Sequence, residues 1–166
     1  MAKGTTNITI VDSSAGTTLG VAGDNYRLIV TGAQTDGAYS CFDMLIPPGG
    51  GPTPHAHPQM QEFFYVIEGE VVFKTEAGHT TVGKGGFVQI PLNGGVHCFY
   101  NGSGRMARLL CTVMPAGLED VFNIIGQPVR PGEFLPIPPI TPEMQQRLGN
   151  LKQKLNQQIY PADYLD

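Results

Sequence analysis

Three of the four histidines in this 166-residue chain could bind a metal ion together with a glutamate. His55 and His57 are two positions apart, so on a strand their side chains point to the same face. Glu62 opens the next apolar stretch, and His97 lies much further along, where a neighbouring strand must supply it. Imidazole and carboxylate ligands together suit Fe, Mn, Ni, Cu, Co or Zn, and not Ca or Mg. The four residues therefore predict a site for one divalent transition metal.

A His-x-His pair alone is weak evidence for a metal, and the spacing around it strengthens the prediction. Residues 49–69 follow Gly-x5-His-x-His-x4-Glu-x6-Gly, with every fixed position filled. Residues 85–101 follow Gly-x5-Pro and then Gly-x2-His-x3-Asn, with one extra residue between Pro91 and Gly94. In these two motifs the chain resembles the cupin superfamily. The resemblance implies the same four metal ligands.

Short segments rich in Ile, Val, Tyr and Phe surround these residues, with turns that contain Gly and Pro between them. The 22 glycines and 14 prolines also favour short strands over long helices. Such a pattern is typical of an antiparallel sandwich or barrel. The cupin resemblance makes this an all-β double-stranded β-helix, or jelly-roll barrel. The expected strands are 7–11, 26–31, 38–46, 62–67, 71–75, 80–82, 87–91, 96–100 and 106–114.

The pattern changes after Pro115. Residues 118–125 carry apolar side chains at helical spacing, and Gly126 is a suitable stop. Residues 127–140 are rich in proline and are expected to be extended, while Thr141 followed by Pro142 is a typical helix start. One domain is therefore expected, with a barrel over 1–114 and a helical extension over 115–166 packed on it. The second helix should bury one apolar stripe: Met144, Leu148, Leu151, Leu155 and Ile159.

The composition narrows the possible partners. A net charge of −4 gives no basic surface for nucleic acid or for an anionic membrane. No apolar stretch approaches a membrane span, and no signal peptide precedes the first strand, so a cytoplasmic protein without a membrane partner is expected. The N-terminal strand and the apolar C-terminal helix could both pack across a two-fold axis, and small cupins are often dimers. A homodimer is therefore expected.

Strand alternation indicates the lining of a substrate pocket. If Glu62 points inward, Phe64 and Val66 do so too, and Phe99 follows His97. These side chains could be ordinary barrel core, but beside a metal they favour an apolar small-molecule substrate. Lys and Arg are scarce near the motifs, which argues against phosphorylated or nucleotide sugars.

Among cupins, the chain resembles small quercetin-dioxygenase-like proteins. This implies oxygen-dependent cleavage of a small enol, diketone or flavonol-like aromatic substrate, with the metal as Lewis acid and Glu62 as catalytic base. Glu62 could be a permanent ligand, a mobile base or both. Two other functions stay open: a metal-dependent isomerase or lyase without oxygen chemistry, and a non-catalytic module that binds a small molecule or a metal.

Overall fold

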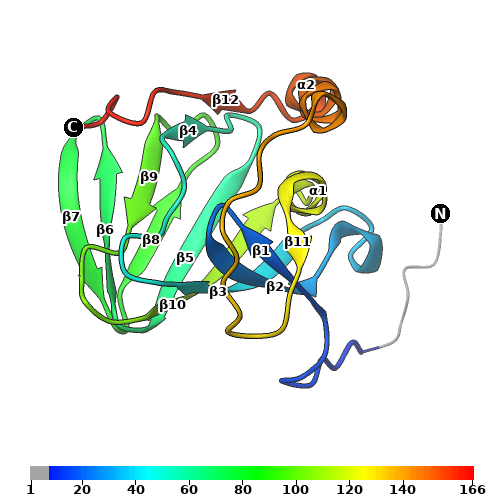
Figure 1. Cartoon of the computed structure of the whole chain (residues 1–166), viewed down its shortest axis with the longest axis horizontal. Helices are drawn as coiled ribbons and strands as arrows, with labels where there is room; N and C mark the ends of the chain where they lie inside the picture. The colour runs from blue at the N-terminus through cyan, green and yellow to red at the C-terminus, as the bar shows by residue number, and fades with distance from the viewer. Residues whose placement is uncertain (1–7) are drawn as a thin grey trace.

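The computed structural model describes residues 8–166 and contains two antiparallel β-sheets that close into a barrel (Figure 1). One sheet has seven strands, in the order β11 (Gln127–Pro128), β1 (Thr17–Val21), β2 (Asp24–Val30), β3 (Ser40–Ile46), β10 (Ala107–Met114), β5 (Gln61–Glu68) and β8 (Phe87–Ile90). The other has five, in the order β12 (Gln158–Ile159), β4 (His55–Ala56), β9 (His97–Tyr100), β6 (Glu70–Thr75) and β7 (Gly78–Gly83). A 3₁₀ turn, η1 (Gly32–Gln34), follows β2. The predicted all-β jelly-roll barrel is confirmed.

Strand alternation places the core between the sheets. On β5, Phe64 and Val66 are buried with Glu62, whereas Tyr65 between them is 46% exposed. On the neighbouring strand β10 every second residue from Ala107 to Val113 is completely buried. The inward-facing side chains of both sheets and of the helices form one hydrophobic cluster. The predicted inward direction of Phe64 and Val66 therefore holds.

The predicted first strand is wrong. Residues 8–11 form no strand, and Ile8 and Ile10 are almost fully exposed; Asn7 lies outside the described residues. The first strand is instead β1, which forms a hairpin with β2 through the two-residue loop Ala22-Gly23. Both loop residues have positive φ, as a type I′ turn requires. Apolar alternation over 7–11 favoured a strand, but residues 8–11 pair with no strand in the described part of the chain.

The C-terminal extension carries two helices and adds one strand to each sheet. Helix α1 (Leu118–Ile125) has the predicted bounds, and α2 (Pro142–Leu155) begins as predicted, with Thr141 accepting a hydrogen bond from the Met144 amide. Ile159 was assigned to the stripe of α2, but it lies beyond the helix, in β12. The two helices contact each other beside one end of the barrel (Figure 1). Neither helix of the described residues is long and apolar enough to cross a bilayer.

Candidate metal centre

The four predicted ligands converge from both sheets. His55 lies on β4 directly opposite His97 on β9, and His57 is the first residue after β4. Glu62 comes from the start of β5 in the other sheet and is buried with His57 and His97. One ligand atom of each residue lies within 4.8 Å of those of the other three. The structure therefore brings together all four residues that the sequence selected.

The loop before His55 is held by backbone contacts that only particular residues allow. Gly51 has a φ of +135°, and a side chain there would meet the Phe99 carbonyl oxygen at 2.1 Å. Asn101, at the end of β9, exchanges backbone hydrogen bonds with Gly49 and Gly50. The Asn101 side-chain amide also donates to the Ile46 carbonyl at 2.9 Å. The glycines and the asparagine of the two motifs thus fix the distance between the two histidine-bearing strands.

Backbone carbonyls orient all three imidazole rings. Each Nδ1 donates a hydrogen bond to a carbonyl oxygen, which requires a proton on Nδ1 and makes Nε2 the nitrogen that can bind a metal. Second hydrogen bonds of this kind are typical of metal-binding histidines, because they fix the tautomer and the ring direction. The pairs are His55 with Thr53 at 2.9 Å, His57 with Met60 at 3.3 Å and His97 with Gly95 at 3.0 Å.

The atoms at the centre of the cluster are buried and lack full hydrogen bonding. Oε2 of Glu62 lies 2.9 Å from Nε2 of His57 and 3.5 Å from Nε2 of His97. The His97 atom makes no hydrogen bond of normal geometry with any described residue, although it is buried. A buried polar atom without a partner is costly unless another group satisfies it. Three imidazole nitrogens and one carboxylate oxygen therefore fit a divalent transition metal well.

Burial and mutual contacts set the charges of the site. Burial lowers the pKa of His55 to about 4, so this ring is neutral at physiological pH. Burial would raise the pKa of Glu62, but hydrogen bonds and charge from His57 and His97 outweigh it and hold that pKa below its usual range. Burial would likewise lower the pKa of His57, and the Glu62 carboxylate outweighs it and raises that pKa. Without metal, the Glu62 carboxylate thus favours a proton on His57, and metal binding would compete with that proton.

The extra residue in the second motif does not displace His97. Asn93 adopts a left-handed conformation with a φ of +58°, and its amide donates to the Pro58 carbonyl at 2.8 Å. Asn tolerates this conformation better than most residues. The added length is therefore taken up in a turn that is tied to the first motif, and β9 starts with His97 in the cluster.

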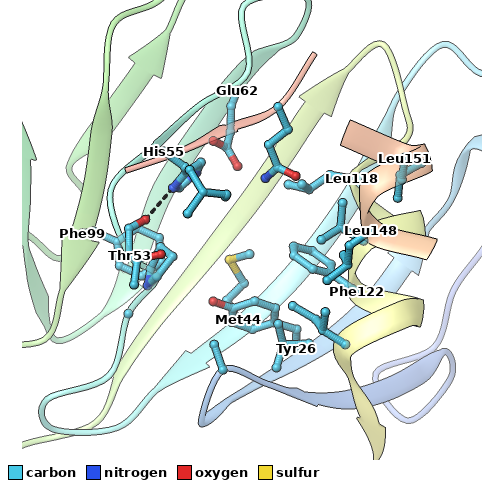
Figure 2. Close-up of a pocket in the computed structure, with 18 of the residues that line it drawn as sticks. Tyr26, Met44, Thr53, His55, Glu62, Phe99, Leu118, Phe122, Leu148 and Leu151 are labelled. Atoms are coloured by element: carbon cyan, nitrogen blue, oxygen red, sulfur yellow. Dashed lines mark hydrogen bonds between the residues drawn. The ribbon is translucent and has the colours of Figure 1, made fainter. Parts of the chain in front are cut away.

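A pocket of about 430 Å³ opens onto His55 and Glu62 (Figure 2). Phe64 and Phe99 line it as predicted, with their rings packed edge to face at 5.4 Å. Val66 is completely buried in the core and is not among the residues that line this pocket. The pocket wall is mostly apolar, so it suits a ligand with a largely apolar body.

Sequence reasoning missed most of this wall. Tyr26 and Met44 contribute to it from the neighbouring strands β2 and β3, and the helices contribute a larger apolar group. The stripe of α2 was interpreted only as packing on the barrel, yet two of its residues face the pocket (Figure 2). The helical residues are Leu118, Val121, Phe122, Ile125, Leu148, Leu151 and Lys152.

One residue that is not a ligand also contacts the cluster. Cys111 on β10 is completely buried, and its thiol donates to Oε1 of Glu62 at 3.1 Å. No motif pointed to this contact.

His79, the fourth histidine, is exposed and bonds the Leu165 carbonyl at 2.6 Å, outside the cluster. This agrees with its exclusion from the predicted ligands.

Residues 42–113 match the family described as the cupin domain. This match covers less than half of the 166 residues. All four candidate ligands lie within the matched region. A cluster of three histidines and one glutamate is typical of metal sites in cupins.

Solved structures with the cupin fold resemble the chain at low identity. A sugar phosphate isomerase from Silicibacter pomeroyi is 20% identical with a TM-score of 0.51; the match covers 57% of this chain and only 61% of that protein. A predicted oxalate decarboxylase from Thermotoga maritima is 21% identical with a TM-score of 0.57, over 64% of this chain and 99% of the other. The polyketide cyclase RemF from Streptomyces resistomycificus is 20% identical with a TM-score of 0.57, over 84% and 97%.

At these identities the similarity shows the fold alone. No curated protein matches the chain significantly. The resemblance to quercetin-dioxygenase-like proteins therefore stays a prediction.

Proposed function

We propose that this protein is a metal-dependent dioxygenase that cleaves a small apolar substrate carrying an enol, diketone or flavonol-like group. The observation that carries the proposal is the largely apolar pocket of about 430 Å³ that opens onto His55 and Glu62. A pocket of this size matches a small aromatic molecule, and the few polar groups at its end would fix the orientation.

The metal fits the four-residue cluster, where it would supply Lewis-acid chemistry to a substrate oxygen. Glu62 is the group that can accept a proton at that end of the pocket. A carboxylate is a weak base, so Glu62 can deprotonate only an acidic hydroxyl. Enols and flavonols carry such hydroxyls, whereas simple alcohols do not.

The walls of the pocket can pack against an aromatic substrate and exclude water from it. Phe64 and Phe99 both line the pocket and can pack against an aromatic ring. The same rings, with Phe122 on the helix side, exclude water from the bound substrate. Lys152 is the one basic residue among those lining the pocket, which disfavours a phosphorylated sugar as substrate.

One observation favours a second candidate function, a metal-dependent reaction without oxygen. The match to RemF extends over 84% of the chain, and that protein is a polyketide cyclase. The same pocket and the same base would serve cyclisation, isomerisation or lyase chemistry on an enolisable ketone. A non-catalytic binding module is the third possibility.

Elemental analysis followed by a substrate screen tests these functions. The purified protein is assayed with flavonols, β-diketones and aromatic polyketones, with and without oxygen. Oxygen uptake in step with substrate loss supports the dioxygenase, and conversion under strict anaerobiosis supports the second candidate. No conversion by metal-loaded protein would contradict both.

Glu62→Gln tests the role of the base, with His79→Gln as the control. We expect Glu62→Gln to lower turnover at least 100-fold and the control to leave it unchanged. Unchanged turnover in a Glu62→Gln protein that keeps its metal would contradict the general-base role.

The predicted homodimer is a separate proposal. Phe87 on β8 is 60% exposed and stacks on Phe63 of β5, so the outer face of the seven-stranded sheet carries exposed aromatic side chains. Light scattering at micromolar concentration measures the mass directly. A monomer mass would contradict the dimer.

A further inference from the structure

A second pair of proton-carrying groups lies away from the metal cluster: Tyr26 lines the pocket, and Asp24 is buried next to it. Asp24 and Tyr26 are two apart on β2, so their side chains share one face of the sheet. The Tyr26 hydroxyl donates a hydrogen bond to Oδ2 of Asp24 at 2.9 Å. Tyr26 lines the same pocket as Glu62 and lies at its other side (Figure 2), with strands β3 and β10 between them in the sheet.

Asp24 is an unusual residue for this position. It is completely buried, and it makes no ion pair with any described basic residue. Its second oxygen, Oδ1, lies beside Gly50 and has no hydrogen bond of normal geometry. A buried carboxyl group without a cation is expensive to keep in a core, so a purely structural role would be served better by a neutral residue.

The protonation of the pair supports a role in proton exchange. Burial raises the pKa of Asp24 to about 7, against the smaller lowering effects of the Tyr26 hydroxyl and the Gly51 amide. Both forms of Asp24 are therefore populated near neutral pH. Burial, the charge of Asp24 and, more weakly, the charge of Glu62 raise the pKa of Tyr26, which keeps the phenol protonated.

We propose that Tyr26 is a second proton-transfer residue of this pocket and that Asp24 positions its hydroxyl and restores its proton. The proposal rests on the proposed function, because it assigns Tyr26 a contact with the substrate of the metal site. It also narrows the substrate class to molecules with two oxygen functions, one for Glu62 and one for Tyr26.

The hydrogen bond between Asp24 and the Tyr26 hydroxyl reverses its direction between the ionised and the protonated form of Asp24. When Asp24 is ionised, it accepts the phenol proton in a hydrogen bond, and the Tyr26 oxygen can accept a hydrogen bond from a substrate hydroxyl. When Asp24 is protonated, its O–H donates to the Tyr26 oxygen, and the phenol proton is free to point at a substrate carbonyl.

Proton transfer from Tyr26 to the substrate then breaks one O–H bond for each O–H bond that it forms. The phenol O–H bond breaks as a bond forms between that proton and the substrate oxygen. The Asp24 O–H bond breaks as its proton passes to the Tyr26 oxygen. Asp24 is left as a carboxylate, Tyr26 is unchanged, and the substrate has gained one proton at the oxygen that faces Tyr26.

The test uses 3-hydroxyflavone as a probe with the metal-free protein. The two emission bands of this flavonol change in ratio when its hydroxyl or carbonyl hydrogen-bonds to a neighbour. Tyr26→Phe keeps the ring and removes the hydroxyl. Tyr160→Phe is the matched control, because the Tyr160 hydroxyl bonds Gln158 at 2.8 Å and does not line the pocket.

We expect Tyr26→Phe to weaken binding of 3-hydroxyflavone about 10-fold, as the loss of one hydrogen bond does, and to change its emission ratio. The control should bind as the unsubstituted protein does. Binding within twofold and an unchanged emission ratio in Tyr26→Phe would overturn the role of Tyr26 while leaving the proposed function standing. No binding by the unsubstituted protein would overturn the proposed substrate class and this proposal with it.

Infrared spectroscopy of the metal-free protein tests Asp24 without relying on turnover. Near pH 6 the carboxylic-acid C=O stretch of Asp24 should be present, and Asp24→Asn should remove it. Adding 3-hydroxyflavone should shift this band in the unsubstituted protein and leave it unmoved in Tyr26→Phe. A band that does not respond to the probe in the unsubstituted protein would show that Asp24 is structural only, and would overturn its part in the proposal.

Discussion

The thiol of Cys111 lies 3.1 Å from Oε1 of Glu62 and is the only described group that hydrogen-bonds this oxygen. The other oxygen of the same carboxylate, Oε2, faces His57 at 2.9 Å. A thiol is a weak donor, but a buried carboxylate oxygen has no water to replace it. Cys111 therefore helps to hold the Glu62 carboxylate in the orientation that turns its other oxygen toward His57 and His97.

Removing this thiol should weaken metal binding. Cys111→Ala leaves Oε1 without a donor, and we expect zinc affinity to fall about 10-fold, as for other groups that orient a metal ligand. Cys111→Ser keeps a donor and should stay within a few-fold of the unsubstituted protein. Competition with a chromophoric chelator measures the affinity. Cys98→Ala, which removes a buried thiol elsewhere, is the control; an equal loss in both alanine variants would argue against a specific role.

His97 and His79 form a matched pair for testing the metal site itself. His97→Gln removes the ligand whose Nε2 has no other partner among the described residues, so we expect zinc affinity to fall at least 100-fold. His79→Gln should not alter it, because His79 only bonds the Leu165 carbonyl at the surface. Isothermal titration calorimetry with zinc gives both values. Similar affinities in the two variants would refute the four-residue site.

Asp24 should make the metal-free protein less stable as the pH rises. Its pKa is raised from 3.8 to about 7, so between these values the folded state holds a proton that the unfolded state has lost. The contribution of Asp24 is complete below pH 3.8 and declines by roughly 4 kcal/mol as the pH passes 7. Urea unfolding between pH 4 and 8 measures this change. We expect the free energy of unfolding of Asp24→Asn to rise relative to that of the unsubstituted protein as the pH increases from 4 to 8. If the difference between the two free energies does not vary with pH, the raised pKa of Asp24 is contradicted.

Gly51 should tolerate no side chain. Its φ of +135° suits glycine alone, and a Cβ would overlap the Phe99 carbonyl oxygen. We expect Gly51→Ala to cost more than about 3 kcal/mol of unfolding free energy and to weaken metal binding by moving the loop before His55. Gly49→Ala is the comparison, since that site has a φ of +77° and nothing within 4 Å of the added carbon. Its cost should be about 1 kcal/mol, from backbone strain alone. Equal costs in urea unfolding would mean that the contact with Phe99 is not the reason.

The four ligands could be found in the sequence because their spacing reflects local backbone requirements. His55, His57 and Glu62 lie on one short stretch whose glycines and prolines set its path, and Asn93 absorbs the added residue before His97. Helix α1 and the start of α2 were also predictable, because apolar spacing and a Thr cap are signals within a few residues. Short-range sequence patterns were thus sufficient to predict the four ligands and much of the fold.

The parts that were missed depend on contacts between distant segments. Cys111 meets Glu62 only because β10 pairs with β5, and nothing near either residue indicates that contact. Tyr26 reaches the pocket because β2 lies two strands from β10 and α1 covers it, with Phe122 packed against the Tyr26 ring at 5.2 Å. The first strand was misplaced for the same reason: Ile8 and Ile10 alternate like a strand but have no partner, whereas Thr17–Val21 has two.

The pairing of β12 with β4 affects how the metal site is assembled. Ile159 lies opposite His55, so the strand that bears this ligand has its outer edge covered by a segment synthesised much later. Until Gln158–Ile159 emerges from the ribosome, that strand presents unpaired amides and carbonyls beside the nascent pocket. The ligands are therefore all translated well before their scaffold is complete, and secure retention of a metal ion is expected to be a late step in the maturation of this protein.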